Sequence, residues 1–196
     1  VSDAKWDIEM KRTVIFALAL VVAGVAGFML QRYLTPESDT DPRSTAIEAA
    51  SSAAVGSTRP EFAMIDINGD MRNISDWEGQ VILLNFWATW CPPCLREIPH
   101  FIEVQQQLES HGFQIVGIAV DDQDAVTEFV DEMSINYPIM AGEVEAIELS
   151  KKYGNSIGGL PYTAFIDRNG IITHTITGEL SEERLISILR ELGLSL

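Results

Sequence analysis

The stretch VILLNFWATWCPPC, residues 81–94, decides the fold of this chain. Its first half, residues 81–87, is a nearly continuous apolar run, which is typical of a β-strand buried on both faces. Its second half places Cys91 and Cys94 where the strand ends and a helix begins, because the Pro92-Pro93 pair suits the first turn of a helix. The stretch therefore predicts an α/β protein with two thiols at a strand-to-helix turn.

The sequence on both sides of this stretch alternates between strand and helix patterns. Residues 61–67 and 71–74 predict a hairpin around Asn68-Gly69, and Ser75 to Glu78 fits a capping box that begins a short helical turn. The later pattern predicts a helix to about residue 110, a strand over 113–120, a helix to 133, a strand over 137–140, a helix over 144–153, a hairpin over 162–177 and a last helix over about 181–192. The alternation predicts a mostly parallel central sheet between helices, with both hairpins adding antiparallel edges.

Composition excludes several classes of protein. The chain has 196 residues, of which 13 are Lys or Arg and 29 are Asp or Glu, so its formal charge is -16. This balance argues against nucleic-acid binding, which needs a basic face. An apolar content of 46% excludes a disordered chain. Two cysteines are too few for a multi-disulfide scaffold or a four-thiolate zinc site.

Residues 13–30 form an uncharged apolar run. As a helix they would reach about 27 Å, close to the thickness of a bilayer core. Lys11 and Arg12 precede the run, which indicates a cytoplasmic N-terminal side. The alternatives are a buried core helix and a cleaved signal peptide. Because the run has no polar stripe and exceeds a usual signal-peptide core of about 7–15 residues, an uncleaved signal anchor is favoured.

The sequence therefore predicts four consecutive parts. These are a cytoplasmic N-terminus (1–12), a transmembrane signal anchor (13–31), a flexible linker (32–58) and a folded domain (59–196). The linker is rich in Ser, Thr, Ala, Asp and Pro and has no apolar periodicity. The sequence leaves open whether the natural chain starts at Val1 or at Met10.

The two cysteines have the spacing needed for thiol-disulfide exchange. Cys91 lies at the expected N-terminus of a helix, where unpaired N–H groups and the positive end of the helix dipole favour a thiolate. Such sites lower the pKa of a cysteine to about 3.5–7.5, and the thiolate is the attacking species. Cys94 lies one turn later and is placed to attack a mixed disulfide on Cys91. This pattern predicts a two-electron dithiol-disulfide exchange.

Three other interpretations of the cysteines remain open. Half of a zinc site would need two more ligands, and His100, His111 and His174 lack ligand spacing. A purely structural disulfide is an alternative, although so short a loop adds about 2 kcal/mol at most. The third is a pair of inert buried thiols. Redox exchange is favoured because a CxxC pair at a strand-to-helix turn is the usual context of a redox motif.

Residues 86–94 (FWATWCPPC) resemble the thioredoxin-fold signature, and residues 159–163 (GLPYT) resemble the cis-proline loop of that fold. Between these motifs the chain is longer than thioredoxin by about one short αβ unit. With the hairpin and the anchor, this insertion is similar to the TlpA/ResA branch. The resemblance implies a thioredoxin fold with a central mixed sheet, flanking helices, an extra N-terminal hairpin and a central αβ insertion. It also implies a membrane-anchored, extracytoplasmic thiol-disulfide oxidoreductase.

The resemblance also implies roles for single residues. Cys91 would be the attacking cysteine and Cys94 the resolving one. Pro161 would be the cis-proline packed against the pair, with Leu160 offering backbone hydrogen bonds to a bound peptide. From the residues alone, Pro161 could equally be a strand-edge proline. The predicted substrate-binding residues are Trp90, Pro92, Leu160 and Pro161; simple core packing is the alternative for Trp90.

Glu97 is the third predicted catalytic residue. It lies three residues after Cys94, on the same helix face. Glu97-Ile98-Pro99 matches a ResA-like pattern, which implies that this carboxylate accepts the proton of the resolving thiol. The alternative is a solvated surface Glu. Asn85 stands where thioredoxin has a buried Asp, and Asn cannot take a proton, so Glu97 becomes more necessary.

The favoured function is a reductase of protein disulfides at a bacterial inner membrane, with its catalytic domain in the periplasm. The resemblance implies a role such as cytochrome c maturation or copper-site assembly, a transmembrane electron donor of DsbD or CcdA type, and no cofactor or metal. One alternative is a disulfide oxidase or isomerase. Another is a copper(I) chaperone that uses Cys91, Cys94 and His174, since soft thiolates suit copper(I). A peroxidase is disfavoured because Ala88 stands where such sites place Thr.

Overall fold

The computed structural model describes residues 54–195. The predicted N-terminal segment, the predicted anchor and most of the predicted linker therefore lie outside the described residues. Within residues 54–195, none of the helices has the length and apolar character needed to cross a bilayer.

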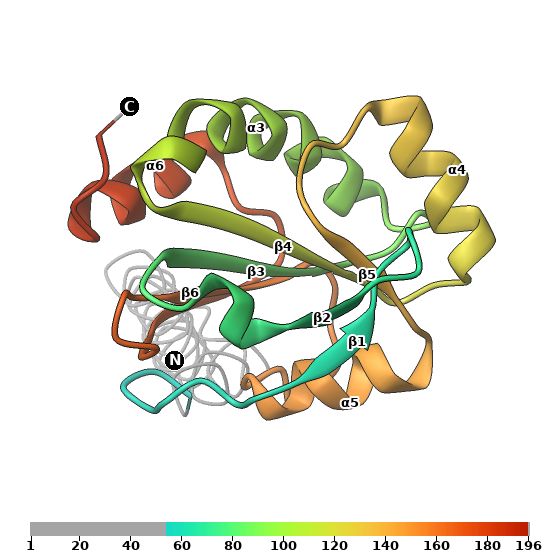
Figure 1. The fold of residues 1–196 in the computed structure, drawn as a ribbon, viewed down its shortest axis with the longest axis horizontal. Helices are drawn as coiled ribbons and strands as arrows, with labels where there is room; N and C mark the ends of the chain where they lie inside the picture. The colour runs from blue at the N-terminus through green and yellow to red at the C-terminus, as the bar shows by residue number, and fades with distance from the viewer. Residues whose placement is uncertain (1–53, 196) are drawn as a thin grey trace, which may run out of the picture. The chain divides into compact units, whose positions relative to one another are not determined.

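A five-stranded mixed sheet forms the centre of the domain, with the strand order β5-β4-β3-β6-β7 (Figure 1). The strands are β3 (Val81–Trp87), β4 (Phe113–Ala119), β5 (Ile139–Ala141), β6 (Tyr162–Ile166) and β7 (Ile172–Thr177). The β3–β4 and β4–β5 pairs are parallel, whereas β3–β6 and β6–β7 are antiparallel. The mixed sheet is thus confirmed, whereas the mostly parallel sheet expected from the alternation alone is wrong. The reason is that the C-terminal hairpin β6–β7 adds beside β3 with two antiparallel pairs, which is the antiparallel edge expected of this hairpin.

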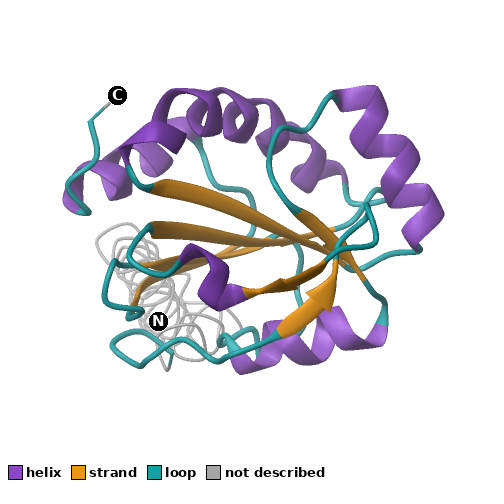
Figure 2. Ribbon diagram, viewed as in Figure 1, coloured by secondary structure: helices purple, strands orange, loops and turns teal. Residues whose placement is uncertain are grey.

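Helices cover both faces of this sheet (Figure 2). The helices are α3 (Pro92–Leu108), α4 (Gln123–Met133), α5 (Val144–Lys152) and α6 (Glu182–Glu191), and a 3-10 turn η2 (Glu109–His111) follows α3. Apolar residues of α3, α4 and α6 pack in one cluster with Leu83, and those of α5 pack in a second cluster with Leu84. Because neighbouring residues of a strand point to opposite faces, the apolar run of β3 supplies both clusters. The predicted central αβ insertion is α4–β5.

Local capping explains where the helices begin. Asp122 accepts hydrogen bonds from the backbone N–H groups of Asp124 and Ala125, and Ser181 accepts one from Arg184. Pro92 begins α3 as predicted, because its missing N–H is not needed in the first turn.

The N-terminal hairpin differs from its prediction. Strands β1 (Ala63–Ile65) and β2 (Met71–Asn73) form a separate two-stranded sheet, and only one isolated bridge, Asp66 to Met140, reaches the central sheet. The predicted antiparallel edge is therefore wrong. The physical reason is the turn after β1, where the Asp66 carboxylate accepts the N–H groups of Asn68 and Asp70 and ends the strand.

The short helical turn that follows also begins earlier than predicted. The turn η1 spans Ile74–Trp77, and the Asp76 carboxylate accepts the backbone N–H of Asn73 at 2.9 Å. The capping pair is thus Asn73 and Asp76 rather than Ser75 and Glu78. Asp76 is the acidic residue that reaches back to an unpaired N–H group, so it selects the start of the turn.

Gly117 provides a test of the packing beneath the central sheet. A Cβ atom on Gly117 would overlap the Cδ1 atom of Ile139 and lie 3.2 Å from Nε1 of Trp87. Both neighbours are 1% exposed, so little room remains for them to move. We expect Gly117→Ala to lower the free energy of unfolding by about 1–3 kcal/mol in a urea titration. Gly142→Ala is the matched control with 3.5 Å of clearance, and an equal loss in both variants would contradict this account.

Candidate functional site

The two cysteines lie together at the carboxyl end of the central strand β3. Cys91 is the N-cap residue of α3 and Cys94 lies in its first turn. The two are joined by a disulfide, and their Cα atoms are 5.3 Å apart. Cys94 is fully buried, whereas Cys91 is 4% exposed. Both residues are therefore buried, and Cys94 is the more completely buried of the two.

Asp121 ties the turn before the cysteines to the neighbouring strand. Its Oδ2 atom accepts hydrogen bonds from the backbone N–H of Thr89, at 3.0 Å, and from the Thr89 hydroxyl. The backbone N–H of Val120 donates to the carbonyl of Trp87 at 2.8 Å in the same region. Sequence reasoning missed Asp121. The available signal was a carboxylate directly after a buried strand, at the sheet edge where parallel strands end.

The proline loop lies at the same edge of the sheet. The Leu160–Pro161 peptide bond is cis, and Pro161 is buried. Tyr162 pairs with Phe86 of β3, so Pro161 lies beside the end of the strand that leads to Cys91. The buried Asn155 side chain fixes the loop: its Nδ2 donates to the Gly159 carbonyl at 2.9 Å, and its Oδ1 accepts the Gly159 N–H at 3.1 Å.

The predicted substrate-binding residues differ in their exposure. Trp90 is 64% exposed and Pro92 is exposed, whereas Leu160 is half-buried. The alternative that Trp90 packs in the core is therefore wrong. Exposed aromatic rings beside a reactive group are the residue type that binds partner proteins, so substrate contact by Trp90 stays a prediction.

Glu97 is buried and held by two hydrogen bonds. The side chain is 1% exposed, so the alternative of a solvated surface Glu is wrong. Nδ2 of Asn85 donates to Oε1 of Glu97 at 2.9 Å, and the backbone N–H of Leu180 donates to Oε2 at 2.9 Å. Burial raises the pKa of Glu97 from its usual 4.5 to about 7, although both hydrogen bonds act in the opposite direction. A nearby acidic side chain, Glu179, raises the pKa further.

The surroundings of Glu97 include residues that sequence reasoning missed. Asn85 also donates to the hydroxyl of Thr163 at 3.0 Å, so it bridges Glu97 and the strand that follows the cis-proline. Tyr137 is buried nearby; burial and then the charge of Glu97 raise the pKa of its phenol, which stays neutral. The one signal in the sequence was Asn85 itself, a polar residue inside an otherwise apolar strand. Nothing local indicated Thr163, Tyr137 or the N–H of Leu180.

His174 does not join the cysteines, so its prediction as a third copper ligand is wrong. It pairs with Phe165 on β6, whereas Thr177 pairs with Tyr162 at the cysteine end of the sheet. The His174 Nε2 atom instead lies 3.3 Å from a carboxylate oxygen of Glu191. Within residues 54–195, no group of three or more His, Cys, Asp or Glu side chains could hold a metal ion.

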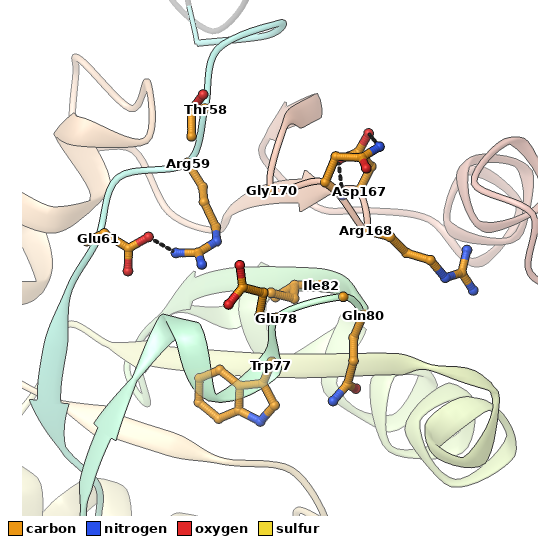
Figure 3. A pocket seen from close by; sticks show the side chains of 12 residues that line it. Thr58, Arg59, Glu61, Trp77, Glu78, Gln80, Ile82, Asp167, Arg168 and Gly170 are labelled. Atoms are coloured by element: carbon orange, nitrogen blue, oxygen red, sulfur yellow. Dashed lines mark hydrogen bonds and ion pairs between the residues drawn. The ribbon is translucent and has the colours of Figure 1, made fainter.

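A polar pocket at the opposite end of the sheet is separate from this site. Gln80, which directly precedes β3, lines it together with Arg59, Glu61 and Asp167 (Figure 3). Arg59 points toward Glu61 and forms an ion pair with it. Because Gln80 and Cys91 stand at opposite ends of the central strand, this pocket does not contact the disulfide.

Comparisons with known proteins point to one chemistry. The family model described as Redoxin matches residues 54–191. Thiol-disulfide oxidoreductase ResA of Geobacillus kaustophilus is 34% identical over 131 residues, covering 66% of this chain and 73% of the relative. ResA of Bacillus thuringiensis subsp. konkukian is 29% identical over 177 residues, covering 89% and 92%. The crystal structure of a thiol:disulfide interchange protein from Chlorobium tepidum superposes with a TM-score of 0.64 at 31% identity, covering 71% of this chain and 97% of that one.

The raised pKa of Glu97 predicts a pH dependence of stability. In the unfolded chain the carboxyl ionises near 4.5, but in the oxidised folded protein it ionises near 7. Between these values the folded state binds the extra proton, so stability falls as pH rises, in total by on the order of 3 kcal/mol. Urea titrations at pH 4.5 and pH 8 should show this loss in the wild type. Glu97→Gln mimics the protonated acid and should lack it; an unchanged pH dependence in that variant would exclude Glu97 as the cause.

Proposed function

Because this chain belongs to the Redoxin family and is a thiol-disulfide oxidoreductase of the ResA type, we propose that it reduces disulfide bonds of partner proteins. One observation carries the proposal: a disulfide at the start of α3 has a buried carboxyl group on the same helix face, three residues after the inner cysteine. The arrangement would provide an attacking cysteine, which is the less buried of the two, a fully buried resolving cysteine and a proton acceptor.

The exchange runs in two steps. In the reduced protein the Cys91 thiolate attacks a substrate disulfide, so a mixed disulfide forms and one substrate thiolate leaves. The Cys94 thiol then loses its proton to the Glu97 carboxylate, and the Cys94 thiolate attacks the sulfur of Cys91. The Cys91–Cys94 disulfide forms and the second substrate thiolate leaves, so two electrons have passed to the substrate.

The environment of Glu97 suits this proton transfer. A group with a pKa of about 7 exists in both protonation states near neutral pH, so it can accept the proton and later release it. The position of Glu97, one turn of helix from Cys94, supports a direct role for this carboxylate. Cys91, at the N-cap of α3, has the helix dipole to stabilise its thiolate.

We further propose that the protein works at a bacterial inner membrane, anchored by residues 13–31, with residues 59–196 in the periplasm. The apolar run after Lys11-Arg12 and the similarity to ResA support this placement. A reductase in an oxidising compartment needs electrons from across the membrane, so we propose a donor of DsbD or CcdA type. Candidate substrates are disulfides formed during cytochrome c maturation or copper-site assembly.

Substitution of each cysteine separates the two steps. Cys91→Ser removes the attacking sulfur and should abolish insulin reduction by the purified protein. Cys94→Ser leaves the first attack intact and should accumulate a covalent mixed disulfide with the substrate, visible on a non-reducing gel. Insulin reduction retained by Cys91→Ser would refute the proposed attacking role.

The reduction potential of the Cys91–Cys94 pair decides the direction of transfer. Equilibration of the full chain in thiol redox buffers, followed by acid quenching and alkylation, gives this potential. We expect a value near or below the roughly −270 mV of thioredoxin, as a reductant requires. A value of about −120 to −180 mV would instead identify an oxidase or isomerase built on the same chemistry.

A further inference from the structure

The segment Gly178-Glu179-Leu180, which joins β7 to α6, contacts both parts of the site; we call it the strap. The backbone N–H of Gly178 donates to the carbonyl of Pro161 at 2.8 Å. The backbone N–H of Leu180 donates to Oε2 of Glu97 at 2.9 Å. Two backbone N–H groups of the strap therefore connect the cis-proline loop to the buried Glu97 carboxyl of α3.

The middle residue of the strap adds a third contact with α3. Oε2 of Glu179 accepts hydrogen bonds from Nε of Arg96, at 2.9 Å, and from a terminal nitrogen of the same guanidinium. The Arg96 and Glu179 side chains are 58% and 41% exposed, whereas their neighbours Glu97 and Leu180 are 1% and 2% exposed. An exposed ion pair and a buried hydrogen bond thus join the same two segments, one residue apart.

We propose that Arg96 and Glu179 are positioning residues for the resolving step, because their ion pair holds the strap against α3 and keeps the N–H of Leu180 on the Glu97 carboxylate. The inference rests on the proposed role of Glu97 as acceptor of the Cys94 proton. It assigns a function to a surface pair that touches neither cysteine. An N–H group can only donate, so its contact stabilises the ionised form of Glu97, the form that accepts the proton.

Two effects of Glu179 on Glu97 oppose one another, and this makes the inference testable. The negative charge of Glu179 raises the pKa of Glu97, whereas the N–H that the strap supplies lowers it. The other groups that face Glu97 are the neutral Tyr137 and Asn85. Cys94, three residues earlier on α3, is held in the disulfide with Cys91. His100, one turn further along α3, faces Glu182 of α6 instead. Removal of the Glu179 side chain therefore raises the pKa of Glu97 if the strap loosens and the Leu180 N–H moves away from the carboxylate. It lowers that pKa if only the charge of Glu179 matters.

The experiment measures the resolving step directly. Reduced full-length protein is mixed with a disulfide-linked peptide, quenched in acid at intervals, and the decay of the Cys91 mixed disulfide is followed from about pH 5 to pH 9. For Glu179→Ala we expect the midpoint of the rate profile to rise by about 0.3–0.5 pH units, within the range of an exposed ion pair. Below the midpoint, the rate then falls about two- to three-fold. Arg96→Gln should give the same upward shift, and the double variant should add nothing further.

Each outcome has a distinct meaning. A downward shift in Glu179→Ala, an upward one in Arg96→Gln and cancellation in the double variant would show a charge effect without the strap, and would overturn the inference. Unchanged midpoints in all three variants would overturn it as well. Lys151→Gln breaks a comparable exposed pair with Glu148 on α5 and should leave the profile unaltered. If Glu97→Gln itself leaves the resolving rate unchanged, the proposed role of Glu97 as proton acceptor is wrong. That result concerns the proposed function and is distinguishable from the strap variants' results, which test the positioning role of Arg96 and Glu179.

Discussion

The placement of one buried carboxyl group, Glu97, is the constraint on which the site depends. Burying a charge is costly unless hydrogen-bond donors surround it. Asn85 supplies a donor from the central strand and Leu180 supplies another from the strap. The Glu97 carboxyl thereby links α3 to β3 and to the strap, although these elements are distant in sequence. The same contacts that reduce the burial cost also hold α3, with its two cysteines, in a fixed relation to the cis-proline loop.

Asn85 explains how the site keeps a single titrating carboxyl. A second carboxylate 2.9 Å from Glu97 would repel it, and the two groups would then share a proton with coupled pKa values. An amide at this place donates one N–H to Glu97 and the other to Thr163, and it takes no part in proton exchange. The neutral phenol of Tyr137 adds no charge on the remaining side. Among Glu97 and the groups that contact it here, Glu97 is therefore the one that the proposed resolving step would use as proton acceptor.

The sequence alone could predict the parts of the molecule that local patterns encode. The apolar run of β3, the prolines at the start of α3 and the spacing of Cys91 and Cys94 are local, and the structure has all three. The contacts of Glu97 with Asn85 and Leu180 join residues 12 and 83 positions apart, and the second donor is a backbone N–H, which any residue provides. The error at His174 has the same origin, because a hairpin pattern does not show which end of the strand lies near the cysteines.

The energetics of Glu97 support the chemical role proposed for it. A glutamine would fill nearly the same volume and its oxygen would accept the N–H of Asn85, but its NH2 group would face the N–H of Leu180, which the second carboxylate oxygen accepts. The amide would avoid the cost of ionising a buried group, but it would leave a buried N–H without an acceptor. The carboxyl lies where its ionisation is costly, one helical turn from the fully buried Cys94. Functional sites are where such local destabilisation persists, and the proposed resolving step would use the charged form of Glu97 despite the cost of burying it.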